Sequence, residues 1–183
     1  MTSELTVPPR KEYQSFHDLP IVTDLDNIEA DVAILGIPFS DPIADGPVIA
    51  ASMHDALIHG ATPGHAFEAV ANVRATVEIP LIAMVSISIV RRLGGMAFVR
   101  RAVEAGFDGL IVPDGDLQDI ADIAKEARDT NIAFTTLIAP GSSLSRTKEI
   151  ASLAHEFLYL LTRRGLTGER SDSPDLANSV RSI

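Results

Sequence analysis

The sequence contains no cysteine, few aromatic residues (5% of 183 positions) and no long hydrophobic segment. Without cysteine the chain can form no disulfide framework, no Cys-ligated zinc site and no thiolate nucleophile. The longest apolar run, residues 79–90, is broken by Pro80 and two serines and is too short to cross a bilayer. We therefore expect no membrane-spanning helix.

Basic residues are also scarce, with 15 Lys and Arg against 25 Asp and Glu, a net charge of −10 and a pI near 4.8. No basic stripe with interleaved aromatic residues occurs, which argues against binding to nucleic acid or to an anionic membrane. The N-terminal sequence MTSELTVPPRKEYQSF lacks the apolar core of a signal peptide. We expect a cytoplasmic protein.

The chain length and a hydrophobic fraction of 46% suit one globular domain. Residues 1–30 are polar and contain prolines, and we interpret them as an irregular N-terminal arm before a folded domain at 31–183. In that domain, short apolar runs predict strands at 31–35, 81–87, 109–112, 132–138 and 157–161. Uninterrupted apolar strands are buried on both faces, which is typical of a parallel sheet covered by helices.

Segments with apolar residues at three- and four-residue spacing lie between these strands and predict helices. Their apolar positions are Phe67, Val70 and Val73; Met96, Val99 and Val103; Leu117, Ile120 and Ile123; and Ile150 and Leu153. Thr62-Pro63 is typical of a helix start, and Gly106 of a helix end. The pattern predicts an α/β fold with about five parallel strands, either an open doubly wound sheet or part of a (βα)8 barrel.

In both architectures the functional residues lie at the carboxyl ends of the strands. Here the loops at those ends carry reactive or unusual side chains, namely Ser40, Asp41 and Asp45; Ser86 and Ser88; Pro113 and Asp114; residues 140–143; and residues 162–168. The opposite ends carry ordinary turn residues, such as 106–108 and 129–131. This asymmetry predicts one functional face.

The loop LGIPFSDPIADGP, residues 35–47, closely resembles the signature loop of the tryptophan synthase alpha subunit family. Further segments resemble that family in order and spacing: residues 50–70, GFDGLIVPD at 106–114, LIAPGSS at 137–143 and YLLTRRGLTGE at 159–169. The resemblance covers roughly residues 35–180. It implies a (βα)8-barrel lyase that cleaves indole-3-glycerol phosphate to indole and glyceraldehyde 3-phosphate in tryptophan biosynthesis.

The resemblance also implies that this chain needs no cofactor of its own and docks on a beta subunit that carries pyridoxal phosphate (PLP). A (βα)8 barrel needs about 250 residues, and the sequence ends in the region that resembles the sixth helix. We therefore expect a partial, truncated barrel without the last two strands. Its sheet would have two open edges, which favour self-association.

A second resemblance concerns residues 11–39, which are similar to the N-terminal region of the agmatinase/ureohydrolase family. The two resemblances share the sequence LGIPF and suggest a fusion, a recombined or misassembled gene, or an engineered chimera, with a diverged natural alpha subunit as the other interpretation. Ureohydrolases need metal-binding clusters of the Asp-x-His-x-Asp kind, and none occurs in the sequence. The histidines at 54, 59 and 65 also have no metal-like spacing.

Retro-aldol cleavage of indole-3-glycerol phosphate requires proton transfer at indole C3 and at the glycerol hydroxyl, work that two carboxylates can divide. By the resemblance, Asp45 matches the carboxylate that interacts with the indole nitrogen. The family's principal acid/base, a glutamate, is replaced by Ile34. Isoleucine cannot transfer a proton, so we expect impaired activity. The alternative is a non-catalytic fragment that acts at most as an interaction module.

The resemblance assigns three further residues to substrate binding. Tyr159 matches the tyrosine beside the substrate on the sixth strand, and Thr167 and Gly168 match the phosphate-binding loop. From the residues alone, Tyr159 is equally well explained as a core aromatic and residues 165–168 as a tight turn. Likewise, Asp45 alone is explained as a cap of the helix that begins near Pro47.

Overall fold

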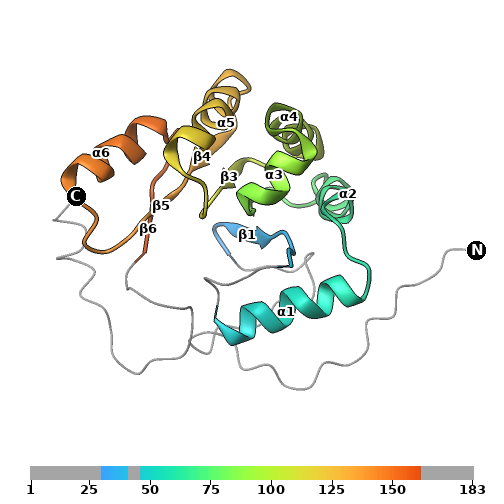
Figure 1. Ribbon diagram of the computed structural model, residues 1–183. Helices are drawn as coiled ribbons and strands as arrows, with labels where there is room; N and C mark the ends of the chain where they lie inside the picture. The colour runs from blue at the N-terminus through green and yellow to red at the C-terminus, as the bar shows by residue number, and fades with distance from the viewer. Residues whose placement is uncertain (1–29, 41–45, 162–183) are drawn as a thin grey trace, which may run out of the picture.

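The computed structural model describes residues 30–40 and 46–161. The elements in chain order are β1 (Ala33–Gly36), α1 (Pro47–Ile58), α2 (Pro63–Val73), β2 (Leu81–Met84), α3 (Ile87–Leu93), α4 (Gly95–Ala105), β3 (Gly109–Ile111), α5 (Leu117–Asp129), β4 (Ala133–Thr135), β5 (Leu137–Ile138), α6 (Leu144–Leu153) and β6 (Tyr159–Leu160). Strands β1 to β4 form one parallel sheet in sequence order, and β5 pairs with β6, also in parallel. Figure 1 shows α2–α6 along one side of the strands and α1 on the other side of β1.

The helix boundaries follow the sequence signals for α2 and α4. Thr62 caps α2, because its side-chain oxygen accepts a hydrogen bond from the backbone N–H of His65 at 3.3 Å, and Pro63 occupies the first turn. Helix α4 ends at Gly106, whose φ of 94° lies in the left-handed region that favours glycine. Both predictions from the sequence are confirmed.

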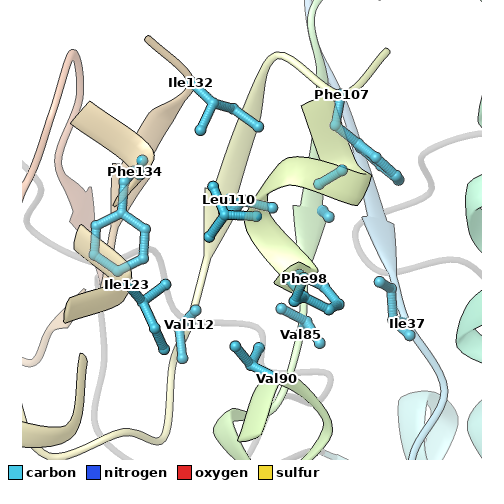
Figure 2. Packing of buried hydrophobic residues seen from close by; sticks show 14 of the residues in the cluster. Ile37, Val85, Val90, Phe98, Phe107, Leu110, Val112, Ile123, Ile132 and Phe134 are labelled. Atoms are coloured by element: carbon cyan, nitrogen blue, oxygen red, sulfur yellow. The ribbon is translucent and has the colours of Figure 1, made fainter. Parts of the chain in front are cut away.

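The hydrophobic core lies between the strands and the helices on one side of them. Figure 2 shows Val85 and Leu110 from the strand layer together with the helix residues Phe98 and Ile123, and all four are almost fully buried. Phe67 packs edge-on against Phe98, with 5.4 Å between the ring centroids. Such aromatic pairs add to the free energy of burial, so this layer holds α2 and α4 together.

Two predicted strands differ from the observed ones. The segment 81–87 is a strand only to Met84, and Ile87 already begins helix α3. Ser86 stops the strand, because its side chain accepts a hydrogen bond from the N–H of Ser88 and caps the helix. The segment 132–138 is divided at Thr136 into β4 and β5.

The buried face of α4 also differs from the predicted apolar positions. Val99 is buried, but Met96 and Val103 are 56% and 38% exposed. The face that packs on the core instead consists of Phe98, Val99, Ala102 and Ala105. Helical spacing alone fits both faces, and contacts with α2 and α5 decide between them.

Strand β1 is less buried than its apolar sequence predicts. Ile34 and Leu35 of the strand are 50% and 39% exposed, and Val32, just before it, is 49% exposed. The reason is the position of β1, which pairs only with β2 in the part of the chain that the structure describes. The first strand is therefore an edge strand with apolar side chains open to solvent.

Helices α4 and α5 are joined by an ion pair. The Arg100 Nε donates to Oε1 of the buried Glu126 at 2.6 Å, and this hydrogen bond, together with the charge of Glu126, raises the pKa of Arg100.

Over the described ranges 30–40 and 46–161, none of the helices is long and apolar enough to cross a membrane. Most of the predicted arm, residues 1–29, lies outside these ranges, so the division into an arm and a domain stays a prediction.

Candidate active site

The carboxyl ends of the parallel strands meet at one edge of the sheet, as expected for both architectures considered from the sequence. The described residues that follow the strands include Ser86 after β2 and Asp114 after β3. We refer to the side where the carboxyl ends of the strands lie as the carboxyl edge, and to the side where their amino ends lie as the amino edge. Neither term refers to the edge strand β1.

At the carboxyl edge, Asp114 joins the loops that follow β2 and β3. Its Oδ2 accepts a hydrogen bond from the Ser86 hydroxyl at 2.6 Å, and its Oδ1 accepts one from the backbone N–H of Ile87 at 2.8 Å. The Ser86 hydroxyl lies 2.8 Å from that of Ser88, and Ser86 also accepts from the Ser88 N–H at 3.2 Å. The carboxylate thus anchors a chain of two hydroxyl groups at the start of α3.

Ser86 and Ser88 differ in exposure. Ser86 is only 3% exposed, whereas Ser88 is exposed. The chain of hydrogen bonds therefore runs from Asp114 through a buried hydroxyl to a hydroxyl at the surface. The sequence places these residues on the functional face but does not reveal their contact, since Ser86 and Asp114 are 28 positions apart.

Ile34 lies on the face of the sheet that is turned away from helices α2–α6. It is in register with Ile82, which is in register with Gly109, and in-register residues of neighbouring strands share a face. A Cβ on Gly109 would lie 2.6 Å from Cδ1 of Ile82, so this glycine makes room for the isoleucine. The alternate positions of the strands belong to the helix-side core, namely Leu81, Ala83, Leu110 and Phe134.

Tyr159 lies on the corresponding face of the second sheet. It is half-buried and in register with Leu137, whereas the next pair, Ile138 and Leu160, packs on the helix-side core. Ile34 and Tyr159 therefore each lie on the face of their own sheet that is turned away from the shared core. The other predicted site residues, Asp45, Thr167 and Gly168, lie outside the described residues.

The amino edge carries a different kind of polar cluster. The Arg74 guanidinium donates to Asp108 Oδ2 at 2.8 Å and to the carbonyl oxygens of Ile79 and Gly106 at 3.3 and 3.4 Å. The same Asp108 oxygen accepts from the Leu81 N–H at 2.8 Å. These bonds tie the ends of α2 and α4 to the start of β2. Elsewhere in the described part of the chain, no three His, Asp or Glu side chains are grouped as a metal site would require.

Comparison with known proteins decides the family. A sequence profile described as "Tryptophan synthase alpha chain" matches residues 11–183. The chain belongs to the tryptophan synthase alpha chain family. The match includes residues 11–39, but no finding bears on the likeness of that segment to ureohydrolases, which stays a prediction.

Individual relatives agree with this assignment. The tryptophan synthase alpha chain of Bacillus cereus (strain AH820) is 39% identical over 155 residues, which are 85% of this chain and 60% of the relative. That of Methanosarcina acetivorans is 40% identical over 152 residues, 83% of this chain and 55% of the relative. The chain therefore spans at most about 60% of the length of these two curated relatives.

Solved structures support the same fold. Tryptophan synthase subunit alpha from Legionella pneumophila superposes with a TM-score of 0.69 at 34% identity, covering 73% of this chain and 51% of that one. The tryptophan synthase complex from Pyrococcus furiosus gives 0.68 at 34% identity, covering 72% and 55%. These neighbours are (βα)8 barrels, so the parallel strands and helices of this chain form part of such a barrel. The prediction of a partial barrel is confirmed, and the open doubly wound sheet is excluded.

Proposed function

We propose that the chain is a tryptophan synthase alpha-type lyase domain in which retro-aldol cleavage of indole-3-glycerol phosphate is impaired. The observation that supports it is the identity of about 39% with alpha chains together with Ile34 at the position where the family carries its acid/base glutamate. General acid–base catalysis contributes about 10²–10⁴-fold to a reaction rate. An isoleucine side chain has no proton to exchange, so this contribution is lost.

The proposed roles of the other residues follow the family pattern. Asp45 interacts with the indole nitrogen, Tyr159 lies beside the substrate, and Thr167 and Gly168 bind the phosphate. Tyr159 lies on the face turned away from the helix-side core, which is compatible with this role. The chain is proposed to act in the cytoplasm and without a cofactor of its own.

The test compares two variants at one position, Ile34→Glu and Ile34→Gln. Glutamine matches glutamate in size and polarity but cannot transfer a proton, so it controls for the change in shape. We expect Ile34→Glu to release indole from indole-3-glycerol phosphate at least about 100 times faster than Ile34→Gln. Because the chain spans only part of its relatives, the ratio of the two rates is the readout rather than the absolute rate.

Equal rates for the two variants would contradict the proposal. They would support the second candidate, a non-catalytic fragment or fusion product that acts as an interaction module. The exposed apolar side chains at the start of the sheet favour this candidate, because Val32 and Ile34 lie on the same face and carry no catalytic group.

The proposed partner is a tryptophan synthase beta subunit, which would carry the PLP. The solved tryptophan synthase complexes among the structural neighbours fit such a partner. Co-elution of this chain with a purified beta subunit in size-exclusion chromatography is the expected result. Separate elution at micromolar concentrations of both proteins would contradict it.

Self-association is also part of the proposal. In the described residues β1 has a neighbour on one side only, and unpaired strand edges invite pairing with another chain. We expect light scattering to give a mass above that of a single chain of 19.5 kDa. A single species of monomeric mass over a range of protein concentrations would contradict this expectation.

A further inference from the structure

We propose that two copies of this chain pair through the open side of β1, as antiparallel strands related by a twofold axis at Ile34. The open side is the side of β1 that faces away from β2. The inference rests on the self-association that forms part of the proposed function, and it adds the strand, its direction and its register. It makes Ile34, at the position proposed for the family's glutamate, a contact between two chains.

The backbone of β1 offers hydrogen-bonding groups on its open side. The N–H groups of Ala33 and Ile37 donate to carbonyl oxygens along the β2 segment, each at 2.9 Å, so these residues are turned toward β2. Along a strand, the N–H and C=O groups of successive residues point alternately to its two sides. Ile34 and Gly36 therefore direct these groups to the open side, where no strand pairs with β1 in the described residues.

No residue of β1 protects this side against pairing. Proteins commonly block an open strand with Lys, with Pro, with a charged side chain or with a bulge. The sequence AILG of β1 contains none of these residues, and its register with β2 is unbroken from Ala33 to Gly36. The side chains of Val32 and Ile34 share a face and are 49% and 50% exposed. The open side therefore favours another strand as its occupant.

The occupant is a second copy because the strand is complementary to itself. With the twofold axis at Ile34, Val32 lies opposite Gly36 of the second copy. On the other face, Ala33 lies opposite Leu35. Each larger side chain thus faces a small one, and even a Cβ built on Gly36 would meet only the end of one side chain, at 3.8 Å. Identical surfaces that pair about a twofold axis form a closed dimer.

Neighbouring registers fit less well. A pairing centred on Leu35 sets Val32 opposite Pro38, which has no N–H to donate. A shift of the pairing by a single residue sets side chains of opposite faces against each other. In the register centred on Ile34, residues 32, 34 and 36 of each copy all meet a residue that can both donate and accept.

The first test is disulfide cross-linking of single-cysteine variants, because the chain has no cysteine of its own. In antiparallel pairs that exchange both hydrogen bonds the Cα atoms lie about 5.5 Å apart, within the reach of a disulfide. Ile34→Cys should therefore give a covalent dimer under mild oxidation, seen on a non-reducing gel.

Val32→Cys is the matched control for cross-linking. Val32 is as exposed as Ile34 and lies on the same face. In the proposed pairing, however, the two copies of residue 32 are about 13 Å apart along the strands, too far for a disulfide. This variant should therefore stay monomeric on the same gel.

The second test uses charge in place of a covalent bond. Ile34→Glu sets two carboxylates directly opposite each other, which destabilises a strand pair. Light scattering should give the native chain at twice the mass of one 19.5 kDa chain and Ile34→Glu at the mass of one. Met96→Glu makes the same change in charge on α4, at a residue that is 56% exposed and outside the pairing. It should keep the native mass.

A monomeric native chain would overturn the inference, and so would a dimer that persists in Ile34→Glu. Equal cross-linking of Ile34→Cys and Val32→Cys would overturn the antiparallel register, because parallel strands in register bring both residues close to their copies. The lyase proposal is judged separately by the indole release of Ile34→Glu and Ile34→Gln. Faster release by Ile34→Glu, without cross-linking of Ile34→Cys, would leave the lyase assignment standing and remove the dimer.

Discussion

The two edges of the sheet are each organised by one aspartate, and the two clusters end differently. At the amino edge, Asp108 accepts from Arg74 and from the Leu81 N–H, and the other Arg74 bonds end on backbone carbonyls. At the carboxyl edge, Asp114 accepts from Ser86 and the Ile87 N–H, and the chain of bonds continues to an exposed hydroxyl.

This difference predicts unequal contributions to stability. The Arg74 cluster bridges the ends of two helices and the start of a strand. The Asp114 cluster joins two loops and ends on an exposed hydroxyl. We therefore expect substitutions at the amino edge to lower the free energy of unfolding more than substitutions at the carboxyl edge.

The largest expected effect on stability is that of Gly106→Ala at the amino edge. The new Cβ would lie 2.6 Å from Cγ of Arg74, and the φ of 94° is unfavourable for alanine. Left-handed backbone costs about 1–2 kcal/mol and overpacking about 1–3. We expect a loss of about 2–4 kcal/mol in urea unfolding, and a loss below about 1 kcal/mol would show that Arg74 moves away at no cost.

The next effect is that of Asp108→Ala. The ion pair with Arg74 is half-exposed and contributes little, but the Leu81 N–H loses its acceptor. We expect a loss of about 1–2 kcal/mol for the unsatisfied donor. Asp108→Asn, which still offers an oxygen to Leu81, is the control and should lose less; equal losses for the two variants would place the effect in the charge.

Ile34→Glu is expected to cost about 1 kcal/mol, because Ile34 is already 50% exposed and loses only part of its burial. Its circular dichroism spectrum should match that of the native chain. A loss of several kcal/mol would mean that residue 34 is a core position, and the rate test of the proposed function would then be confounded by unfolding.

The smallest effect belongs to Asp114→Asn, at about 0.5 kcal/mol, because asparagine keeps a partner for both Ser86 and the Ile87 N–H. This result would sharpen the contrast between the edges. A loss of stability as large as that of Asp108→Ala would break it, since the carboxyl edge would then also be a structural clamp.

The sequence predicts the parallel α/β order, the start of α2 and the end of α4, because these depend on local signals such as Thr62 and Gly106. It does not predict α3, since the apolar run from Leu81 continues through the strand and into the helix. What divides that run is Ser86, held by Asp114 from another loop. A contact between residues 28 positions apart leaves no trace in local periodicity.

The candidate site is only partly visible from the sequence for the same reason. The loop residues at the carboxyl edge can be read directly from the sequence, and the assignment of Ile34 to the family's glutamate position rests on the resemblance and stays a prediction. The faces on which the site residues lie cannot be read from the sequence. Strand register assigns Ile34 and Tyr159 to the side turned away from helices α2–α6. The exposure of β1 likewise depends on its place at the edge of the sheet.

The central claim is that Ile34 removes the principal proton-transfer group from an otherwise recognisable alpha-type lyase domain. The most direct measurement is indole release from indole-3-glycerol phosphate by the purified native chain, beside a complete tryptophan synthase alpha chain under the same conditions. We predict no release above the enzyme-free blank. Turnover by the native chain at a rate near that of the complete alpha chain would contradict the account.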